Sequence, residues 1–196
     1  MRASFSDGQR GFTLIEILVV ITIMGIVFAF AAPAIREFTQ NNRQAVALNR
    51  FIGFLNYARS EAVKRGATVT VCKSAGVGAA AACGGAGVNW EDGWLVYQDD
   101  NGDGTVDGGE VFLRSGEPLT PSFLTMRGAG PVVNRVTFTS RGYSNNAGTF
   151  RVCDARGVNS AKGIRISTMG RITRAVDGPD ADIIIESAGG VNVACP

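Results

Sequence analysis

The first part of the chain carries one unbroken apolar run. Residues 12–32 read FTLIEILVVITIMGIVFAFAA, and the polar exceptions within this run are Thr13, Glu16 and Thr22. As a helix at about 1.5 Å per residue, the run would span roughly 30 Å, which matches the hydrocarbon thickness of a bilayer. The preceding residues 1–11 are polar and include two arginines. This arrangement predicts a membrane-spanning segment that follows a cytoplasmic leader.

From Pro33 onward the pattern changes to an amphipathic one. Apolar residues recur at steps of three and four, namely Ile35, Phe38, Leu48, Phe51, Ile52, Leu55, Ala58 and Val63. This spacing extends the helix, so we expect one helix from about Phe12 to Arg65 that Gly66 ends. Residues 12–32 would lie in a membrane or a fibre core, and residues 33–66 would pack one stripe against a globular head. Pro33 is expected to kink or loosen the helix locally.

Residues 67–196 read as a head built from short strands. The segments are rich in β-branched and aromatic residues, and Gly, Pro, Asn or Asp separate them. The predicted strands are 68–73, 93–98, 110–114, 132–140, 149–154, 163–168, 171–175 and 182–186. Eight short strands after one long helix predict an α+β fold, with antiparallel sheets wrapped on the amphipathic half of the helix.

Composition narrows the range of functions. Hydrophobic residues make up 45% and charged residues 18%, values that are typical of a folded protein. The chain contains no histidine, which excludes imidazole general-base chemistry and histidine-bound metals. It also has no glycine loop of the phosphate-binding type and no nucleophile paired with a base. We therefore expect a protein that is not an enzyme.

The four cysteines indicate an oxidising compartment. Three pairings are possible, and the favoured one joins Cys72 to Cys83 and Cys153 to Cys195. The first bond would close a loop of mostly Gly and Ala, and the second would hold the last residues, which otherwise tend to fray. The alternatives are free buried thiols or a zinc site, although the chain has neither a C-x-x-C spacing nor a histidine.

Glu16 is the unusual residue of the apolar run. A carboxylate at the edge of a membrane span is costly and usually has a partner. The only obvious break for a processing enzyme, Gly11, precedes the apolar run, so cleavage there would leave the helix on the mature chain. The new amino group of Phe12 would then lie about one helical turn from Glu16. The carboxylate of one subunit could pair with the amine of its neighbour and set the register of an assembly. A plain signal anchor is the alternative, but it leaves Glu16 unexplained.

The motif of residues 11–16, Gly-Phe-Thr-Leu-Ile-Glu, resembles the prepilin processing motif of type IV pilins and type II secretion pseudopilins. The resemblance implies cleavage after Gly11 by a prepilin peptidase, N-methylation of Phe12, a docking role for Glu16 and a type IV pilin-like fold. Residues 56–66, Asn-Tyr-Ala-Arg-Ser-Glu-Ala-Val-Lys-Arg-Gly, are similar to the helix end of H-type pseudopilins and of the FimT and FimU minor pilins. The resemblance covers the whole chain and is firm to about Arg114.

One acidic loop fits a calcium-binding pattern. Residues 99–110 place oxygen-bearing side chains where an EF-hand loop has its ligands, with a glycine at the turn: Asp99, Asn101, Asp103, Asp107 and Glu110, with Gly104. The flanking segments read as strands rather than helices, so the alternative is a hairpin whose turn uses Asn-Gly and Asp-Gly. No cofactor is expected to be required, and calcium is the candidate ion.

The late strands offer an alternative function. Between residues 151 and 174 lie six basic residues, Arg151, Arg156, Lys162, Arg165, Arg171 and Arg174, against one acidic residue, Asp154. Such a patch can neutralise phosphates without reading sequence. Some FimT-like minor pilins are DNA receptors whose binding strand resembles Gly-Arg-x-Arg, and this chain has Gly170-Arg171-Ile172-Thr173-Arg174. The second arginine is one residue late, which on a strand points it to the opposite face unless Met169 and Gly170 bend the chain. The candidate DNA contacts are Arg165, Arg171 and Arg174, and the alternative is a solvated basic face.

Together these observations predict a minor pilin or pseudopilin. It would wait in the inner membrane with its head in the periplasm and then enter a fibre, in or near the tip, beside other minor and major pilins. The two alternatives are a minor pilin that binds double-stranded DNA for natural transformation and a pseudopilin of type II secretion. The four cysteines and the basic late strands favour the pilus.

Overall fold

The long helix predicted from the apolar pattern is present. The computed structural model describes residues 12–78, 80–175 and 195, and in it α1 runs from Leu14 to Arg65 over 52 residues. Pro33 lies inside α1. The helix ends as predicted at Gly66, whose φ of 64° is a conformation that glycine adopts without strain. The amide of Ala67 donates to the carbonyl of Ala62 (3.2 Å), and the amide of Gly66 donates to that of Val63 (3.4 Å), which is a Schellman cap.

The chain divides into two compact units within α1, residues 1–40 and residues 41–196. In the first unit, the described apolar side chains from Phe12 to Phe30 are about half exposed or more. In the second unit, the remaining part of α1 packs with the head. This unit begins at Asn41, eight residues after Pro33, whereas the amphipathic half was expected to start at Pro33 itself.

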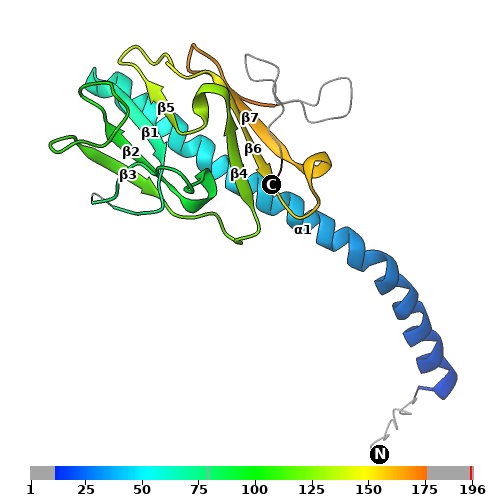
Figure 1. The fold of residues 1–196 in the computed structure, drawn as a ribbon. Coiled ribbons are helices and arrows are strands. Elements are labelled where there is room, and N and C mark those ends of the chain that lie inside the picture. Colours follow the sequence, from blue (N-terminus) through cyan, green and yellow to red (C-terminus); the bar gives the residue numbers. More distant parts are fainter. Residues whose placement is uncertain (1–11, 79, 176–194, 196) are drawn as a thin grey trace, which may run out of the picture. The chain divides into compact units, whose positions relative to one another are not determined.

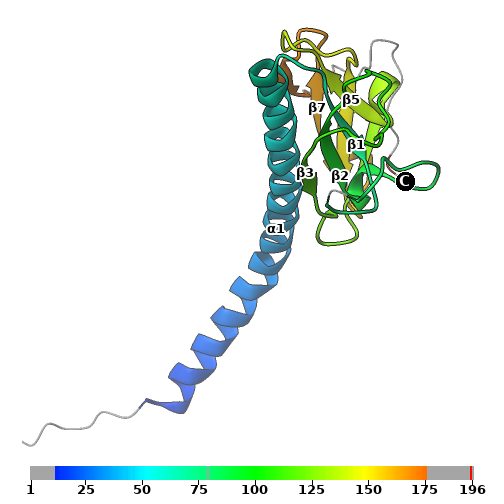
Figure 2. The same ribbon diagram turned by 90° about the vertical axis from the view of Figure 1, so that its left-hand side faces the viewer.

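The head consists of two antiparallel sheets (Figures 1 and 2). The first has the strand order β3-β2-β1-β5, and the second has the order β4-β6-β7-β8. The bounds in the first sheet are β1 (Val69–Lys73), β2 (Trp94–Gln98), β3 (Phe112–Gly116) and β5 (Arg135–Phe138). Those in the second are β4 (Thr125–Ala129), β6 (Gly148–Cys153), β7 (Lys162–Ile166) and β8 (Ile172–Arg174). Within the described residues, three 3-10 helices connect the strands: η1 (Trp90–Asp92), η2 (Gly130–Val132) and η3 (Val158–Ser160).

Of the eight strands in the part of the chain that the structure describes, seven were predicted and one was missed. Strand β4 was not predicted because its sequence, Thr-Met-Arg-Gly-Ala, alternates polar and apolar residues only weakly and contains a glycine. The predicted strand 132–140 was too long, because its first residue belongs to η2 and the strand begins only at Arg135. The predicted strand 182–186 lies outside the described residues.

The core joins both sheets to α1 through one aromatic cluster. Phe51 is fully buried and makes edge-to-face contacts with Trp90, Trp94 and Phe150, at ring-centroid distances of 5.4, 5.1 and 4.8 Å. Trp94 lies in the first sheet and Phe150 in the second, so one helical side chain connects three elements. Edge-to-face contacts add to the stabilisation that such large side chains gain by burial.

The structure contains both disulfides of the favoured pairing. Cys72 bonds Cys83 across 11 residues, and Cys153 bonds Cys195 across 42 residues. The first bond closes the Gly- and Ala-rich loop that follows β1. The second ties the end of β6 to Cys195, which packs beside Ala129 and Ala161.

Candidate functional site

The start of α1 is a capping box that contains Glu16. Thr13 precedes the first helical residue, and both its backbone amide and its hydroxyl donate to Glu16 Oε2 at 2.9 Å. The amide of Glu16 donates in return to Thr13 Oγ1 at 3.3 Å. This reciprocal pattern satisfies helix amides that have no partner within the helix. Sequence reasoning treated Thr13 only as a polar interruption, although the Thr-x-x-Glu spacing signals a capping box.

The capping box fixes Glu16 close to the predicted processing point. Phe12 lies directly before Thr13, and 84% of its surface is exposed, whereas Gly11 lies outside the described residues. A negative charge in the first helical turn is also favoured by the helix dipole. The carboxylate is therefore held one turn inside the helix, beside the position where a new amino terminus would stand.

The first half of α1 has the dimensions of a membrane span. Its most apolar 18-residue window has a mean hydropathy of 2.7 and contains no buried residue. By length and composition alone, this helix can cross a bilayer. Glu16 is the one acidic residue in the first turn of α1.

The acidic loop between β2 and β3 is organised by its own hydrogen bonds. Asp99 is fully buried, and its Oδ2 accepts from the hydroxyl of Thr70 (2.7 Å) and from the amide of Gly104 (3.1 Å). Thr70 also contacts the hydroxyl of Thr137 (2.8 Å). Asp99 therefore anchors the loop to the first sheet. Burial and the nearby charge of Asp99 together raise the pKa of the neighbouring Tyr97 far above its usual range.

The other predicted calcium ligands bond one another and the loop backbone. Asn101 Nδ2 donates to Asp107 (2.8 Å) and to Asp103 (3.1 Å), while Glu110 accepts from the amides of Asp100 (3.1 Å) and Asp107 (2.9 Å). In the part of the chain that the structure describes, no three acidic or cysteine side chains are grouped as a metal site requires. The loop is thus held by hydrogen bonds of the kind expected for a hairpin turn, and calcium binding stays a prediction.

The six basic residues of the late strands do not form one patch. Arg151 is buried, with 1% of its surface exposed. Arg156 is held by Asp154 (2.7 Å) and by Asn41 (3.0 Å), and Lys162 donates to the carbonyl of Asn41 (2.8 Å). Arg156 and Lys162 therefore tie the head to α1, Arg151 lies in the interior, and the exposed ones are Arg165, Arg171 and Arg174.

The strand register separates the three exposed arginines into two groups. Arg165 pairs with Thr173, whereas Arg174 pairs with the buried Ile164, so Arg165 and Arg174 project from opposite faces of the β7–β8 hairpin. The amide of Ser167 donates to the carbonyl of Arg171 (3.0 Å), which continues the register and leaves Arg171 on the face of Arg165. The turn at Met169 and Gly170 does not return Arg174 to that face.

Tertiary contacts place Arg141 and Tyr143, which sequence reasoning did not select, beside Arg171. The amide of Ser144 donates to the carbonyl of Thr168 (2.9 Å), which joins the loop 139–143 to the turn 167–171. Arg59 of α1 bonds both segments through the carbonyls of Gly142 (2.9 Å) and Met169 (3.1 Å). The exposed Arg141 and Tyr143 therefore lie beside the turn that carries Arg171. We call Arg141, Tyr143, Arg165 and Arg171 the basic surface.

Two family models match the chain. Residues 47–170 match the type II transport protein GspH, and residues 7–32 match the prokaryotic N-terminal methylation motif. The first match covers more than half of the chain. The chain belongs to the GspH family. It is therefore a minor pilin or pseudopilin, and the prediction made from the motif at residues 11–16 and from the helix end is confirmed.

Three solved structures are similar to the GspH-family chain, and the first of them supports its fold. The type IV minor pilin FimU of Pseudomonas aeruginosa is 23% identical over 70% of this chain and 91% of its own, with a TM-score of 0.52. A second crystal form of FimU gives 22% identity over 66% and 90% of the two chains, with a TM-score of 0.47. The minor pseudopilin EpsH from the type 2 secretion system of Vibrio cholerae gives 11%, 69% and 98%, with a TM-score of 0.46. No curated protein sequence matches this chain.

Proposed function

We propose that this GspH-family chain is a fibre subunit that is processed after Gly11, methylated on Phe12 and incorporated in or near the fibre tip, where it supports assembly. Before assembly, the apolar half of α1 anchors it in the inner membrane and the head stands in the periplasm. Its partners are a prepilin peptidase and other minor and major pilins. The protein has a structural role and catalyses no reaction.

The capping box at Thr13 and Glu16 is the observation that carries this proposal. It holds a carboxylate in the first turn of an apolar helix, where an unpaired charge would be costly in a membrane or a fibre core. Cleavage after Gly11 creates a positive amino group on Phe12 at the same end of the helix. The Glu16 carboxylate of one subunit can then form an ion pair with the Phe12 amino group of the next subunit. The two disulfides suit a head that folds in the oxidising periplasm.

The mass of the mature protein tests the processing step. We expect the chain purified from membranes to begin at Phe12 and to carry one added methyl group on its amino terminus. Replacing Gly11 by a bulky residue should leave the leader in place while the protein stays in the membrane. A mature chain that begins elsewhere, or that retains residues 1–11, would contradict the proposal.

The basic surface favours a second function, the binding of double-stranded DNA. The tertiary structure brings an aromatic residue, Tyr143, beside Arg141 and Arg171. Tyr143 has 51% of its surface exposed. The fixed contacts of Arg59 keep the two loops together, so the cations are displayed on a defined surface. Several cations on one exposed surface can neutralise phosphates, and this electrostatic attraction weakens steeply with salt.

A gel shift across a salt series tests this second function on the full-length chain in detergent. We expect Arg141→Ala/Arg171→Ala to weaken binding at every salt concentration and to lower the slope of log affinity against log salt by about two, roughly one for each lost phosphate contact. The matched control is Arg174→Ala, which removes the same charge from the other face and should leave binding unchanged. Absence of binding by the unaltered protein at low salt, or equal losses in both variants, would leave only the assembly role.

A further inference from the structure

Residues 99–110, between β2 and β3, form a loop whose two ends are held together. The amide of Gln98 donates to the carbonyl of Val111 (2.9 Å), which closes the hairpin directly outside the loop. The first and last residues of the loop therefore lie at the same end of the hairpin. The loop carries five carboxylates, those of Asp99, Asp100, Asp103, Asp107 and Glu110. Negative charges at such close spacing repel one another unless a positive group balances them.

Asp99 supplies the observation that points to a cation. Its side chain is fully buried, and its Oδ2 accepts from the hydroxyl of Thr70 (2.7 Å) and from the amide of Gly104 (3.1 Å). The loop thus folds over this carboxylate. The second oxygen, Oδ1, is also buried and has no hydrogen-bond partner in the part of the chain that the structure describes. A buried carboxylate oxygen without a partner is costly, and a cation inside the loop would supply the missing partner.

The other acidic side chains of the loop already face its interior. Asn101 Nδ2 donates to Asp107 (2.8 Å) and to Asp103 (3.1 Å), so two carboxylates meet at one nitrogen. The two oxygens of Glu110 accept from the amides of Asp100 (3.1 Å) and Asp107 (2.9 Å), across the loop. Neutral amides therefore hold these carboxylates in place. A divalent cation would bind them more strongly, because its charge opposes theirs directly.

The order of ligands along the loop selects calcium. A calcium loop takes oxygen ligands from positions 1, 3, 5, 7, 9 and 12 and needs a glycine at position 6 for its sharp turn. Gly104 stands at position 6 and has a φ of 76°, a left-handed conformation that glycine adopts without strain. In order, the ligands are Asp99, Asn101, Asp103, the backbone carbonyl of Thr105, Asp107 and Glu110.

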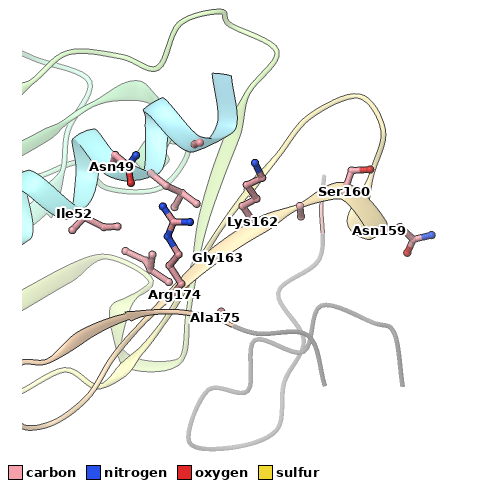
Figure 3. Close-up of a pocket in the computed structure, with 12 residues that line it drawn as sticks. Asn49, Ile52, Asn159, Ser160, Lys162, Gly163, Arg174 and Ala175 are labelled. Atoms are coloured by element: carbon pink, nitrogen blue, oxygen red, sulfur yellow. The ribbon is translucent and has the colours of Figure 1, made fainter. Parts of the chain in front are cut away.

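The acidic loop and the basic pocket of the head belong to different sheets. Lys162 and Arg174 line a pocket between α1 and the β7–β8 hairpin (Figure 3). The acidic loop joins two strands of the other sheet, and a cation that packs against it is Arg135. A Cβ added to Gly104 would overlap the guanidinium of Arg135, so this side chain lies directly on the turn. Its single charge offsets one of the five carboxylates and opposes a bound cation.

We propose that the loop 99–110 binds a calcium ion. The described carboxylates are not grouped as a metal site requires, so binding draws Asp107 and Glu110 away from the backbone amides and onto the ion. Calcium accepts such a flexible set of oxygen ligands, whereas magnesium demands a small octahedral site and keeps several waters. The ion would fix the β2–β3 connection of the head. The site is separate from the processing motif and from the basic surface, so it adds a ligand to the proposed function.

A metal titration of the full-length chain in a non-ionic detergent tests the site. The probes are calcium chloride and magnesium chloride, and equilibrium dialysis with radioactive calcium measures the bound ions per chain. We expect one calcium ion per chain with a dissociation constant of about 0.1–1 mM, the range of extracellular calcium modules. The backbone amide resonances of Asp100, Gly104 and Asp107 should shift in a saturable way. Magnesium should bind at least about tenfold more weakly.

Three variants separate ligation from general charge attraction. Glu110→Gln keeps an oxygen for the backbone amides but removes the charge of the last ligand, so calcium should bind at least about tenfold more weakly. The matched control is Asp100→Asn, which removes the same charge from position 2, where a calcium loop has no ligand. Its affinity should stay within about threefold of the unaltered chain, because an exposed charge is screened by solvent. Arg135→Gln should tighten binding severalfold, since it removes the opposing cation.

Equal losses in Glu110→Gln and Asp100→Asn would overturn the proposal, because binding would then follow net charge rather than ligand position. Absence of saturable calcium binding by the unaltered chain, or equal affinities for calcium and magnesium, would also overturn it. An unchanged amide spectrum outside the loop shows that each variant is folded. The titration reads the loop alone, so its outcome is independent of processing, fibre incorporation and DNA binding.

Discussion

Replacing Glu16 by alanine should remove the chain from fibres while leaving it processed and in the membrane. In the assembled state, the loss of the carboxylate leaves the amine of a neighbouring subunit unpartnered in an apolar fibre core. Breaking one side of a buried ion pair costs about 3–5 kcal/mol, so incorporation should fall by roughly a hundredfold or more. Immunoblots of sheared fibres and of membranes from the same cells measure the two populations separately.

Two control variants separate the charge of Glu16 from its hydrogen bonds. Glu37→Ala removes an exposed carboxylate from the same helix and should leave incorporation normal. Thr13→Ala removes the hydroxyl contacts to Glu16 but keeps the backbone amide of residue 13, so it should reduce incorporation far less than Glu16→Ala. Normal fibre incorporation of Glu16→Ala would refute the role assigned to this carboxylate.

Replacing Phe51 by alanine should destabilise the head by about 3–5 kcal/mol, the usual cost of truncating a buried phenylalanine. The ring is fully buried and contacts Trp90, Trp94 and Phe150, so its removal leaves a cavity where α1 meets both sheets. The sequence has two tryptophans, and both touch Phe51. Their fluorescence during denaturant unfolding, with the disulfides intact, therefore reports directly on the affected region.

The matched control is Phe123→Ala. Phe123 has 44% of its surface exposed and meets Arg43 at 5.8 Å from the ring centre. Its truncation removes little buried area, and we expect a change below about 1 kcal/mol. If both substitutions shifted the unfolding midpoint by similar amounts, Phe51 would not be the residue that joins α1 to the two sheets.

The spacing of apolar residues along the sequence predicted the helix and most of the strands, because these elements follow local patterns. The apolar run from Phe12 and the steps of three and four residues predicted α1 to within two residues at its start, and Gly66 predicted its end. Short alternating segments predicted seven of the strands. The motif at residues 11–16 predicted a pilin or pseudopilin, and the helix end at residues 56–66 predicted the H-type branch. Both are local features that need no tertiary contact.

The roles of individual side chains in the head were decided by tertiary structure. Asp99 fitted a calcium ligand by spacing, yet it is buried against Thr70 of β1, 29 residues away, and this contact anchors the loop. Such a contact depends on strand pairing between distant segments, which spacing within the loop does not encode.

The basic residues also show that local spacing predicts residue types, whereas tertiary contacts decide which side chains lie together. Sequence proximity grouped Arg165, Arg171 and Arg174, but the two-residue period of a strand turns Arg174 into a pocket against α1. Arg59 then brings Arg141 and Tyr143 beside Arg171 from a separate loop. The sequence by itself determined the long apolar helix, the N-terminal methylation motif and the fold class, because local sequence patterns carry them. The tertiary structure alone decided which charges share a surface, because hydrogen bonds between residues far apart in the chain fix that arrangement.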